Sequence, residues 1–124
     1  MQARTGLMEA PAFCPIVADY YCGMEVTVPL FAKELRGDAQ DIKEIYKNTY
    51  RDTIVTYTDD FEEDGFASAG RFAGTDGMQL CVAGNEERIL LVARYDNLGK
   101  GASGAAVQCM NLAMGADPGK GLVL

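Results

Sequence analysis

The sequence predicts an α+β domain built on an antiparallel or mixed β-sheet, with helices covering one face of that sheet. Five strand-like runs outnumber two helical segments, and the last two runs are joined by a short hairpin loop, which favours this class. The chain has 124 residues, 48% of them hydrophobic and 23% charged, which suits one globular domain with a single core.

The charge balance argues against nucleic acid and membrane partners. A formal net charge of -7 repels a phosphate backbone, and no cluster of Lys and Arg offsets it. The longest apolar runs are far shorter than the roughly 20 residues of a membrane-spanning helix. The N-terminus lacks the basic-then-apolar pattern of a secretion signal, so we expect a cytoplasmic protein.

The residue types argue against several kinds of catalytic and metal site. The chain has no histidine, which removes Ser-His and Cys-His nucleophile pairs and the commonest metal ligand. Its cysteines form no C-x-x-C pair, so we expect no metal site and buried free thiols. These cysteines are Cys14, Cys22, Cys81 and Cys109.

Two strands and one helix are predicted in the first half of the chain. Phe13 to Val17 and Met24 to Leu30 have the apolar and β-branched character of strands. One face of the second strand is expected to be solvated or paired with another subunit. Asp38 can cap a helix over Ala39 to Tyr50, whose apolar residues recur at helical spacing. In the strand predicted over Met24 to Leu30, the inward side is expected to carry Met24, Val26, Val28 and Leu30, and the outward side Glu25, Thr27 and Pro29.

Three more strands and a final helix are predicted in the second half. Thr53 to Tyr57 is β-branched and aromatic, and the acidic segment Asp59 to Gly77 is a long connection. Met78 to Ala83 and Arg88 to Arg94 should pair antiparallel through a four-residue loop. The helix over Ala102 to Met114 is apolar or small nearly all round, so we expect something outside this chain to cover part of it.

Two glycine-containing motifs match ligand-binding loops incompletely. Asp60 to Gly65 has the spacing that opens a calcium loop, but Arg71 stands where the bidentate glutamate belongs, which favours a solvated acidic loop. Gly99 to Gly104 fits the G-x-G-x-x-G dinucleotide pattern, yet Gly115 to Leu124 offers no further strand with an acidic residue for the ribose. The turn still suits an anion, because glycines allow close approach and Lys100 lies beside a helix N-terminus.

The stretch Tyr95 to Asn111, YDNLGKGASGAAVQCMN, resembles the C-terminal signature of N-acetyl-gamma-glutamyl-phosphate reductase, an enzyme of arginine biosynthesis. Phe13 to Leu30 is similar to that family's F-x-P segment and the strand after it, and Gly74 to Val92 resembles its last hairpin. A shorter D-N-L-x-K-G-A core also occurs in aspartate-semialdehyde dehydrogenases, but the continuation S-G-A-A-V-Q-x-M-N favours the acetylglutamyl enzyme.

The resemblance implies a two-domain NADP-dependent enzyme related in its C-terminal domain to glyceraldehyde-3-phosphate dehydrogenase-like enzymes. Residues 1–96 would form the α+β domain that dimerises and lines the substrate site. Residues 97–124 would form a turn and helix that dock on a Rossmann cofactor domain. Asn97, Lys100 and Gly101 would then lie toward the nicotinamide end of NADPH.

The implied chemistry is attack of a cysteine thiolate on an acyl phosphate, loss of phosphate, and hydride transfer from NADPH to release the semialdehyde. The family's cysteine segment P-G-C-Y-P-T and histidine segment H-x-H-x-P-E are absent here, so we expect this chain to hold no catalytic residue. Many relatives carry an arginine where this chain has Cys22. We expect a homo-oligomeric fragment of the reductase that is inactive alone and does not bind NADPH tightly.

Two other interpretations remain open from the sequence. One is a free-standing interaction module that dimerises through its sheet and meets no cofactor. The other is the corresponding domain of an aspartate-semialdehyde dehydrogenase.

Overall fold

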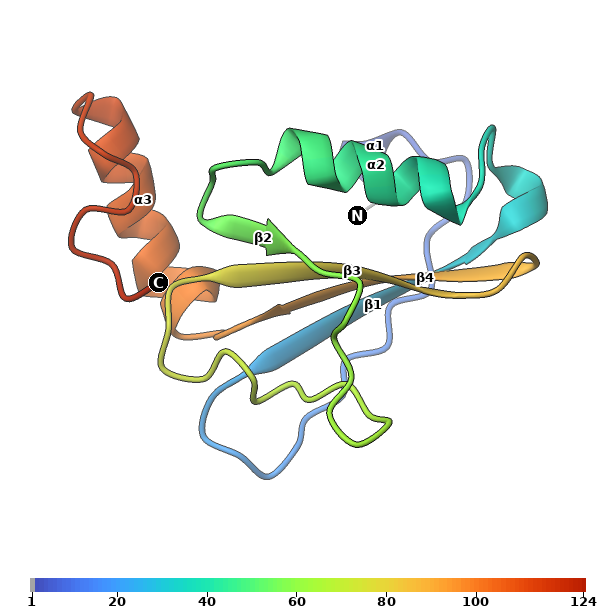
Figure 1. The fold of residues 1–124 in the computed structure, drawn as a ribbon, viewed down its shortest axis with the longest axis horizontal. Coiled ribbons are helices and arrows are strands. Elements are labelled where there is room, and N and C mark those ends of the chain that lie inside the picture. The colour runs from blue at the N-terminus through green and yellow to red at the C-terminus, as the bar shows by residue number, and fades with distance from the viewer. Residues whose placement is uncertain (1) are drawn as a thin grey trace.

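The computed structural model describes residues 2–124 and confirms the predicted α+β class, with a four-stranded mixed sheet and helices (Figure 1). Within this range no helix is long and apolar enough to cross a membrane. The elements are the helix α1 (Gln2–Thr5), the strand β1 (Met24–Phe31), the 3-10 turn η1 (Ala32–Glu34), the helix α2 (Ala39–Thr49), the strands β2 (Val55–Tyr57), β3 (Met78–Gly84) and β4 (Arg88–Tyr95), the π-helical turn η2 (Gly99–Ser103) and the helix α3 (Gly104–Ala113).

The sheet has the strand order β1-β4-β3-β2. β4 pairs antiparallel with both β1 and β3, whereas the short β2 runs parallel to β3. The predicted hairpin between β3 and β4 is confirmed. Its loop is one residue shorter than expected, because Gly84 still belongs to β3. Asn85 fixes the loop by accepting hydrogen bonds from the N–H groups of Glu87 and Arg88, each at 2.9 Å.

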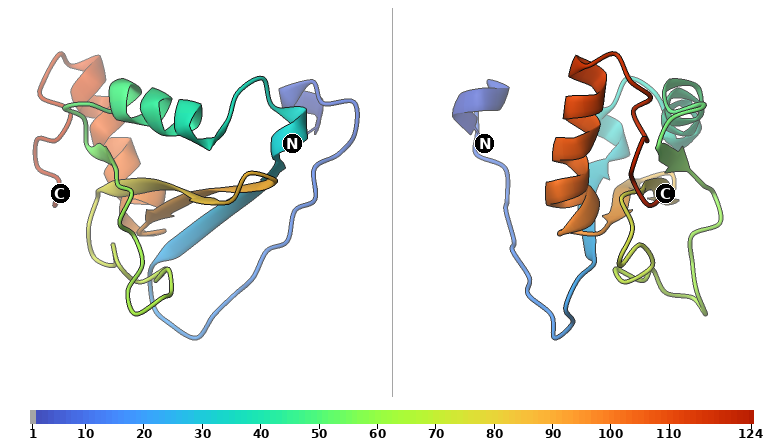
Figure 2. Two further views of the ribbon diagram at one scale, coloured as in Figure 1. Left: turned by 45° about the vertical axis from the view of Figure 1, so that its right-hand side comes forward. Right: turned by 90° about the vertical axis from the view of Figure 1, so that its left-hand side faces the viewer.

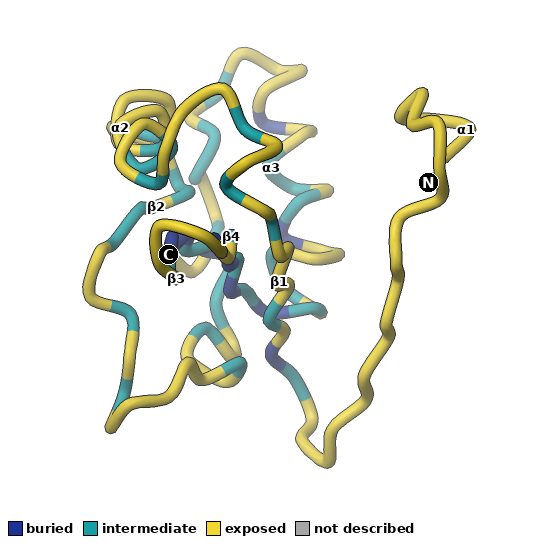
Figure 3. Tube along the Cα trace, turned by 90° about the vertical axis from the view of Figure 1, so that its right-hand side faces the viewer, coloured by how far each residue is buried: buried dark blue, intermediate teal, exposed yellow. Residues whose placement is uncertain are grey.

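The sheet lies between two unlike layers. α2 lies over one face, and the connection of residues 58–77 runs along the other (Figure 1). On the helix side, the ring of Tyr46 lies 6.2 Å from that of Tyr57, and Lys43 and Lys47 both pair with Asp59, at 3.1 and 2.8 Å. The buried hydrophobic residues gather in the two central strands (Figure 3) and are Leu80, Cys81, Val82, Ile89 and Val92.

The strand predicted over Phe13 to Val17 is wrong. Every residue from 2 to 21 is exposed, and the part that follows α1 is an extended segment that stands apart from the rest of the described chain (Figure 2). Pro11 and Pro15 have no backbone N–H to donate, which disfavours ladder pairing there. Apolar composition alone therefore does not identify this segment as a strand.

The predicted strand over Met24 to Leu30 is confirmed, but its inward face is only partly covered. Val26 and Val28 are 41% and 45% exposed, although both were expected to point into the core. The reason is topological: β1 is an edge strand, and α2 lies mainly against β2 and β3. This apolar side of β1 therefore remains open in the chain.

The four cysteines are free, as expected, but only Cys81 is buried. Cys14 lies on the exposed N-terminal segment, and Cys109 lies on the outward side of α3. Cys22 is half-buried beside the end of β4. The expectation of buried thiols is therefore wrong for Cys14 and Cys109 and only partly met by Cys22, because it rested on the general tendency of unpaired cysteines to lie in protein cores.

The helix predicted over Ala39 to Tyr50 is confirmed, and its start is fixed by a reciprocal cap. The Asp38 carboxylate accepts from the N–H of Asp41 at 3.0 Å, and the Asp41 carboxylate accepts from the N–H of Asp38 at 2.9 Å. Two of the N–H groups that every helix leaves without intrahelical partners are thereby satisfied.

Replacing Asp38 with Ala is expected to lower the free energy of unfolding by about 1 kcal/mol, because the first turn of α2 loses its cap. Asn48→Ala on the same helix removes a polar side chain that caps nothing and is the matched control. Urea unfolding followed by circular dichroism measures both. An Asp38→Ala variant as stable as Asn48→Ala would contradict the capping role.

Candidate functional site

A shallow hollow of about 270 Å³ opens where β4 ends. Three separate stretches meet there: the turn before β1, the end of the connection 58–77, and the turn from β4 into η2. Each stretch contributes polar atoms or backbone to the wall. The lining residues are Tyr21, Cys22, Gly74, Thr75, Asp76, Asp96, Leu98, Gly99 and Ser103.

Asp96 is the buried centre of this site, with 2% of its surface exposed. One carboxylate oxygen accepts from the N–H of Gly74 at 2.5 Å. The other accepts from the N–H groups of Leu98 and Gly99, at 2.7 and 3.1 Å. One side chain therefore fastens the connection 58–77 to the turn that leads into η2.

These contacts also set the protonation of the site. Burial is the largest single influence and would raise the pKa of Asp96, but hydrogen bonds from Gly74, Leu98, Cys22 and Gly99 together outweigh it and lower the pKa to about 2. The hydrogen bond of Cys22 to Asp96, aided by desolvation and the nearby negative charge, raises the pKa of the Cys22 thiol. Cys22 is therefore a protonated hydrogen-bond donor at neutral pH and a poor nucleophile.

The G-x-G-x-x-G segment folds as the π-helical turn η2 followed by α3. The N–H of Gly101 donates to the carbonyl of Asp96 at 2.8 Å, five residues back, which is the spacing of a π-turn. A Cβ at Gly99 would collide with the carbonyl of Thr75, and one at Gly104 would collide with the carboxylate of Asp76. At these two positions glycine is required because the connection 58–77 of the same chain lies too close for a side chain.

The structure brings the three expected cofactor residues into one turn, and the side chains of two of them make hydrogen bonds within the chain. Asn97 accepts from the N–H of Gly23 at 2.9 Å, which ties the turn to the start of β1. Lys100 donates to the side chain of Gln108 on α3, and partial burial lowers the pKa of its ammonium. Gly101 is exposed.

α3 and the residues after it form a compact unit against the same site. Asn111 is buried and donates to the carbonyls of Pro118 and Lys120, at 3.2 and 2.9 Å. The N–H of Val123 donates to the carboxylate of Asp76 at 3.0 Å. Met110 and Leu112 of α3, and Met114 directly after it, are exposed, so the described chain leaves much of this apolar helix uncovered, as its composition predicts.

Sequence reasoning named Asn97, Lys100 and Gly101 but did not single out Asp96, Gly74 or Asp76. An Asp directly after a predicted strand and before a glycine-rich turn is a signal for Asp96, because such a carboxylate commonly accepts the free N–H groups that follow it. The partners on the connection 58–77 have no comparable signal. They are brought to the site only by the tertiary fold.

Asp96→Asn is expected to lower the free energy of unfolding at pH 7 by about 2 kcal/mol, because an amide nitrogen would then face the N–H of Gly74. The folded pKa lies below the ordinary value near 4, so this stabilisation is present above about pH 4 and lost as the pH falls toward 2. Asp60→Asn, at an exposed carboxylate, is the control. Urea titrations between pH 7 and pH 2 measure both variants, and equal pH dependence in wild type and Asp96→Asn would contradict the assignment.

Comparison with known proteins agrees with the resemblance stated above. No protein-family model matches the chain. It is 40% identical over 122 residues to the N-acetyl-gamma-glutamyl-phosphate reductases of Brucella ovis, Brucella canis and Brucella suis, and the alignment covers 93% of this chain and 39% of each relative. The chain is therefore homologous to N-acetyl-gamma-glutamyl-phosphate reductase, over nearly all of its own length and over part of the length of that enzyme.

Proposed function

We propose that this chain forms part of a cytoplasmic N-acetyl-gamma-glutamyl-phosphate reductase of arginine biosynthesis, which reduces N-acetyl-glutamyl 5-phosphate to the semialdehyde with NADPH. The observation that carries the proposal is the 40% identity over 122 residues, which includes the turn Asn97 to Gly101. The chain itself would supply a scaffold and contacts to the cofactor, since it has no histidine and the pKa of the Cys22 thiol in the site is raised.

The turn after β4 fits a nicotinamide cofactor in its chemistry. When bound, the cofactor supplies the hydride that reduces the acyl group. Lys100 offers a cation to its phosphates, and the exposed Gly101 lets backbone approach the ring. The main role of Asn97 would be to orient the turn through its hydrogen bond with Gly23.

We assign two parts to the chain within the enzyme. Residues 1–96 would form the domain that dimerises and lines the substrate site, and residues 97–124 would dock on the cofactor domain. The exposed side of α3 supports the second part, because Met110 and Met114 are 53% and 74% exposed. Apolar surface of this kind is normally covered by another domain or subunit.

The exposed side of β1 supports a homo-oligomer. Val26 and Val28 stand open on an edge strand, and a two-fold contact would bury the same residues from both subunits. The sheet is thus proposed as the subunit interface and α3 as the contact with the cofactor domain.

A chimaeric enzyme tests the proposed function. Residues 2–124 of this chain would replace the matched part of the Brucella ovis reductase, and NADPH oxidation in the presence of the acyl phosphate would be followed by absorbance. The chimaera is expected to be active, because every segment that the relative aligns with this chain would be present. A folded but inactive chimaera would contradict the proposal.

In that chimaera, Lys100→Ala is expected to raise the KM for NADPH about fivefold, because a cation near the cofactor phosphates is lost. The KM for the acyl phosphate should change little. Lys120→Ala removes an exposed cation outside the turn and is the control. An unchanged KM for NADPH in Lys100→Ala would remove this residue from the cofactor site.

Val26→Asp combined with Val28→Asp is expected to convert a dimer to a monomer at tens of micromolar protein, because charges on the interface would have to be buried. Ile45→Asp, at an exposed apolar position of α2, is the matched control and should remain dimeric. Sedimentation velocity measures all three. A monomeric wild-type protein would contradict the assignment of the interface.

A further inference from the structure

The sheet face beneath the connection 58–77 carries a row of charged and polar side chains that lies outside the site described above. Glu25 of β1, Arg94 of β4 and Gln79 of β3 are direct register partners and therefore lie side by side across three strands. Arg94 is 1% exposed and is the largest fully buried side chain in the described part of the protein. A buried guanidinium in this position needs acceptors for its N–H groups.

Arg94 finds its acceptors on the central strand and on the connection, and none on β1. Its Nε and Nη2 donate to the side-chain oxygen of Gln79 at 3.2 and 2.5 Å. Its Nη1 donates to both carboxylate oxygens of Glu63, at 3.3 and 3.2 Å, and to the carbonyl of Ser68 at 3.4 Å. The ring of Phe61 lies 6.0 Å from the guanidinium. The connection is therefore held on the sheet largely through Arg94.

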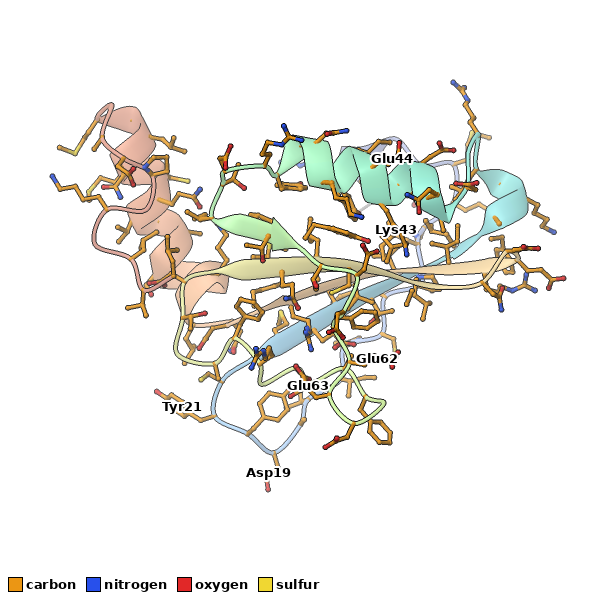
Figure 4. All side chains as sticks on the ribbon, in the orientation of Figure 1. Asp19, Tyr21, Lys43, Glu44, Glu62 and Glu63 are labelled. Carbon is orange, nitrogen blue, oxygen red and sulfur yellow. The ribbon has the colours of Figure 1, made fainter. Side chains whose placement is uncertain are left out.

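Glu63 is well placed to hold the connection in this position. It starts a tight two-residue turn, in which its N–H and carbonyl pair with Phe66 and in which Asp64 and Gly65 both have positive φ. Its carboxylate also accepts from the N–H of Ser68 at 3.1 Å and faces Arg71 at 3.6 Å. Figure 4 shows Glu63 between the connection and the sheet.

Glu25 is a second carboxylate next to the same guanidinium, and it is poorly satisfied. One of its oxygens accepts from Thr27 at 3.3 Å. The other is buried and has no hydrogen-bond partner among residues 2–124. Leaving a buried acceptor without a donor costs free energy, and its direct register partner Arg94 is the cation of this row.

We propose that Glu25 and Glu63 compete for Arg94, and that this competition is a latch for the connection 58–77. With Arg94 on Glu63 the connection lies on the sheet, and with Arg94 on Glu25 it is released. Two features lower the cost of the exchange: the Glu63 side chain is 41% exposed and gains water on opening, while the buried oxygen of Glu25 gains a partner.

Release of the connection would also open the hollow at the end of β4. Gly74 and Asp76 belong to the same connection, and Gly74 donates to Asp96. Arg94 and Asp96 stand two residues apart and hold the connection at two points. Access to the Cys22 and Asp96 side of the site would therefore widen only if Gly74 also leaves Asp96.

Cys81 reports on the opening directly. It lies on β3 two residues from Gln79, on the same face as Arg94, and is fully buried. Burial raises the pKa of the Cys81 thiol to about 11, Arg94 lowers it, and Glu25 and Glu63 raise it further, so all of these groups surround one thiol. Replacing the other three cysteines with Ser leaves Cys81 as the single thiol for labelling with Ellman's reagent.

The latch predicts that two isosteric variants change the labelling rate of Cys81 in opposite directions. Glu63→Gln weakens the closed state, so the labelling rate of Cys81 should rise at least about tenfold. Glu25→Gln removes the competing carboxylate, so the labelling rate should fall at least about threefold. Glu62→Gln makes the same charge change at an exposed neighbour and is the control, with an unchanged rate. If Glu63→Gln fails to fold, Glu25→Gln alone decides the question.

The urea dependence separates the latch from global unfolding. Opening of the connection exposes less surface than unfolding of the whole domain, so the labelling rate in the parent protein should depend on urea much less steeply than global unfolding does. A rate that rises steeply with urea would show that labelling requires unfolding and would overturn the proposal. A Glu25→Gln variant that labels as fast as the parent, or faster, would overturn it as well.

Discussion

The carboxylate of Asp96 joins three parts of the chain that are far apart in sequence. It accepts hydrogen bonds from an N–H group of the connection 58–77 and from two N–H groups of the turn into η2. The Cys22 thiol, which precedes β1, also donates a hydrogen bond to it. An ionised carboxylate with several N–H donors is stabilised in its charged form, so it stays ionised although it is buried. The hollow at the end of β4 exists only while these contacts hold.

Strand β4 and the residue after it hold the connection 58–77 at two points. Arg94 binds the connection over the sheet, and Asp96 binds it again beyond the strand end. The connection reaches the turn so closely that Gly99 and Gly104 have no room for a side chain. A sequence pattern that resembles a dinucleotide loop therefore has a packing reason here, whatever ligand the turn also meets.

Much of the fold follows from local sequence. Alternation in β1, the cap at Asp38 and the two apolar runs around Asn85 identify elements whose residues interact within a few positions or across one hairpin. The segment from Phe13 to Val17 was predicted wrongly because strand composition does not supply a pairing partner. Asn97, Lys100 and Gly101 were named from the family resemblance. The contacts of Gly74 and Asp76, and those of Arg94 with Glu63 and Ser68, join residues more than twenty positions apart, which periodicity cannot reveal.

Hydrogen exchange of individual amides tests the central role of Asp96 most directly. The N–H groups of Gly74, Leu98 and Gly99 lie in loops, yet we expect them to exchange far more slowly than the amides of the exposed N-terminal segment, because all three donate to one buried carboxylate. Exchange of these three amides at the rate of the exposed N-terminal segment would contradict the account.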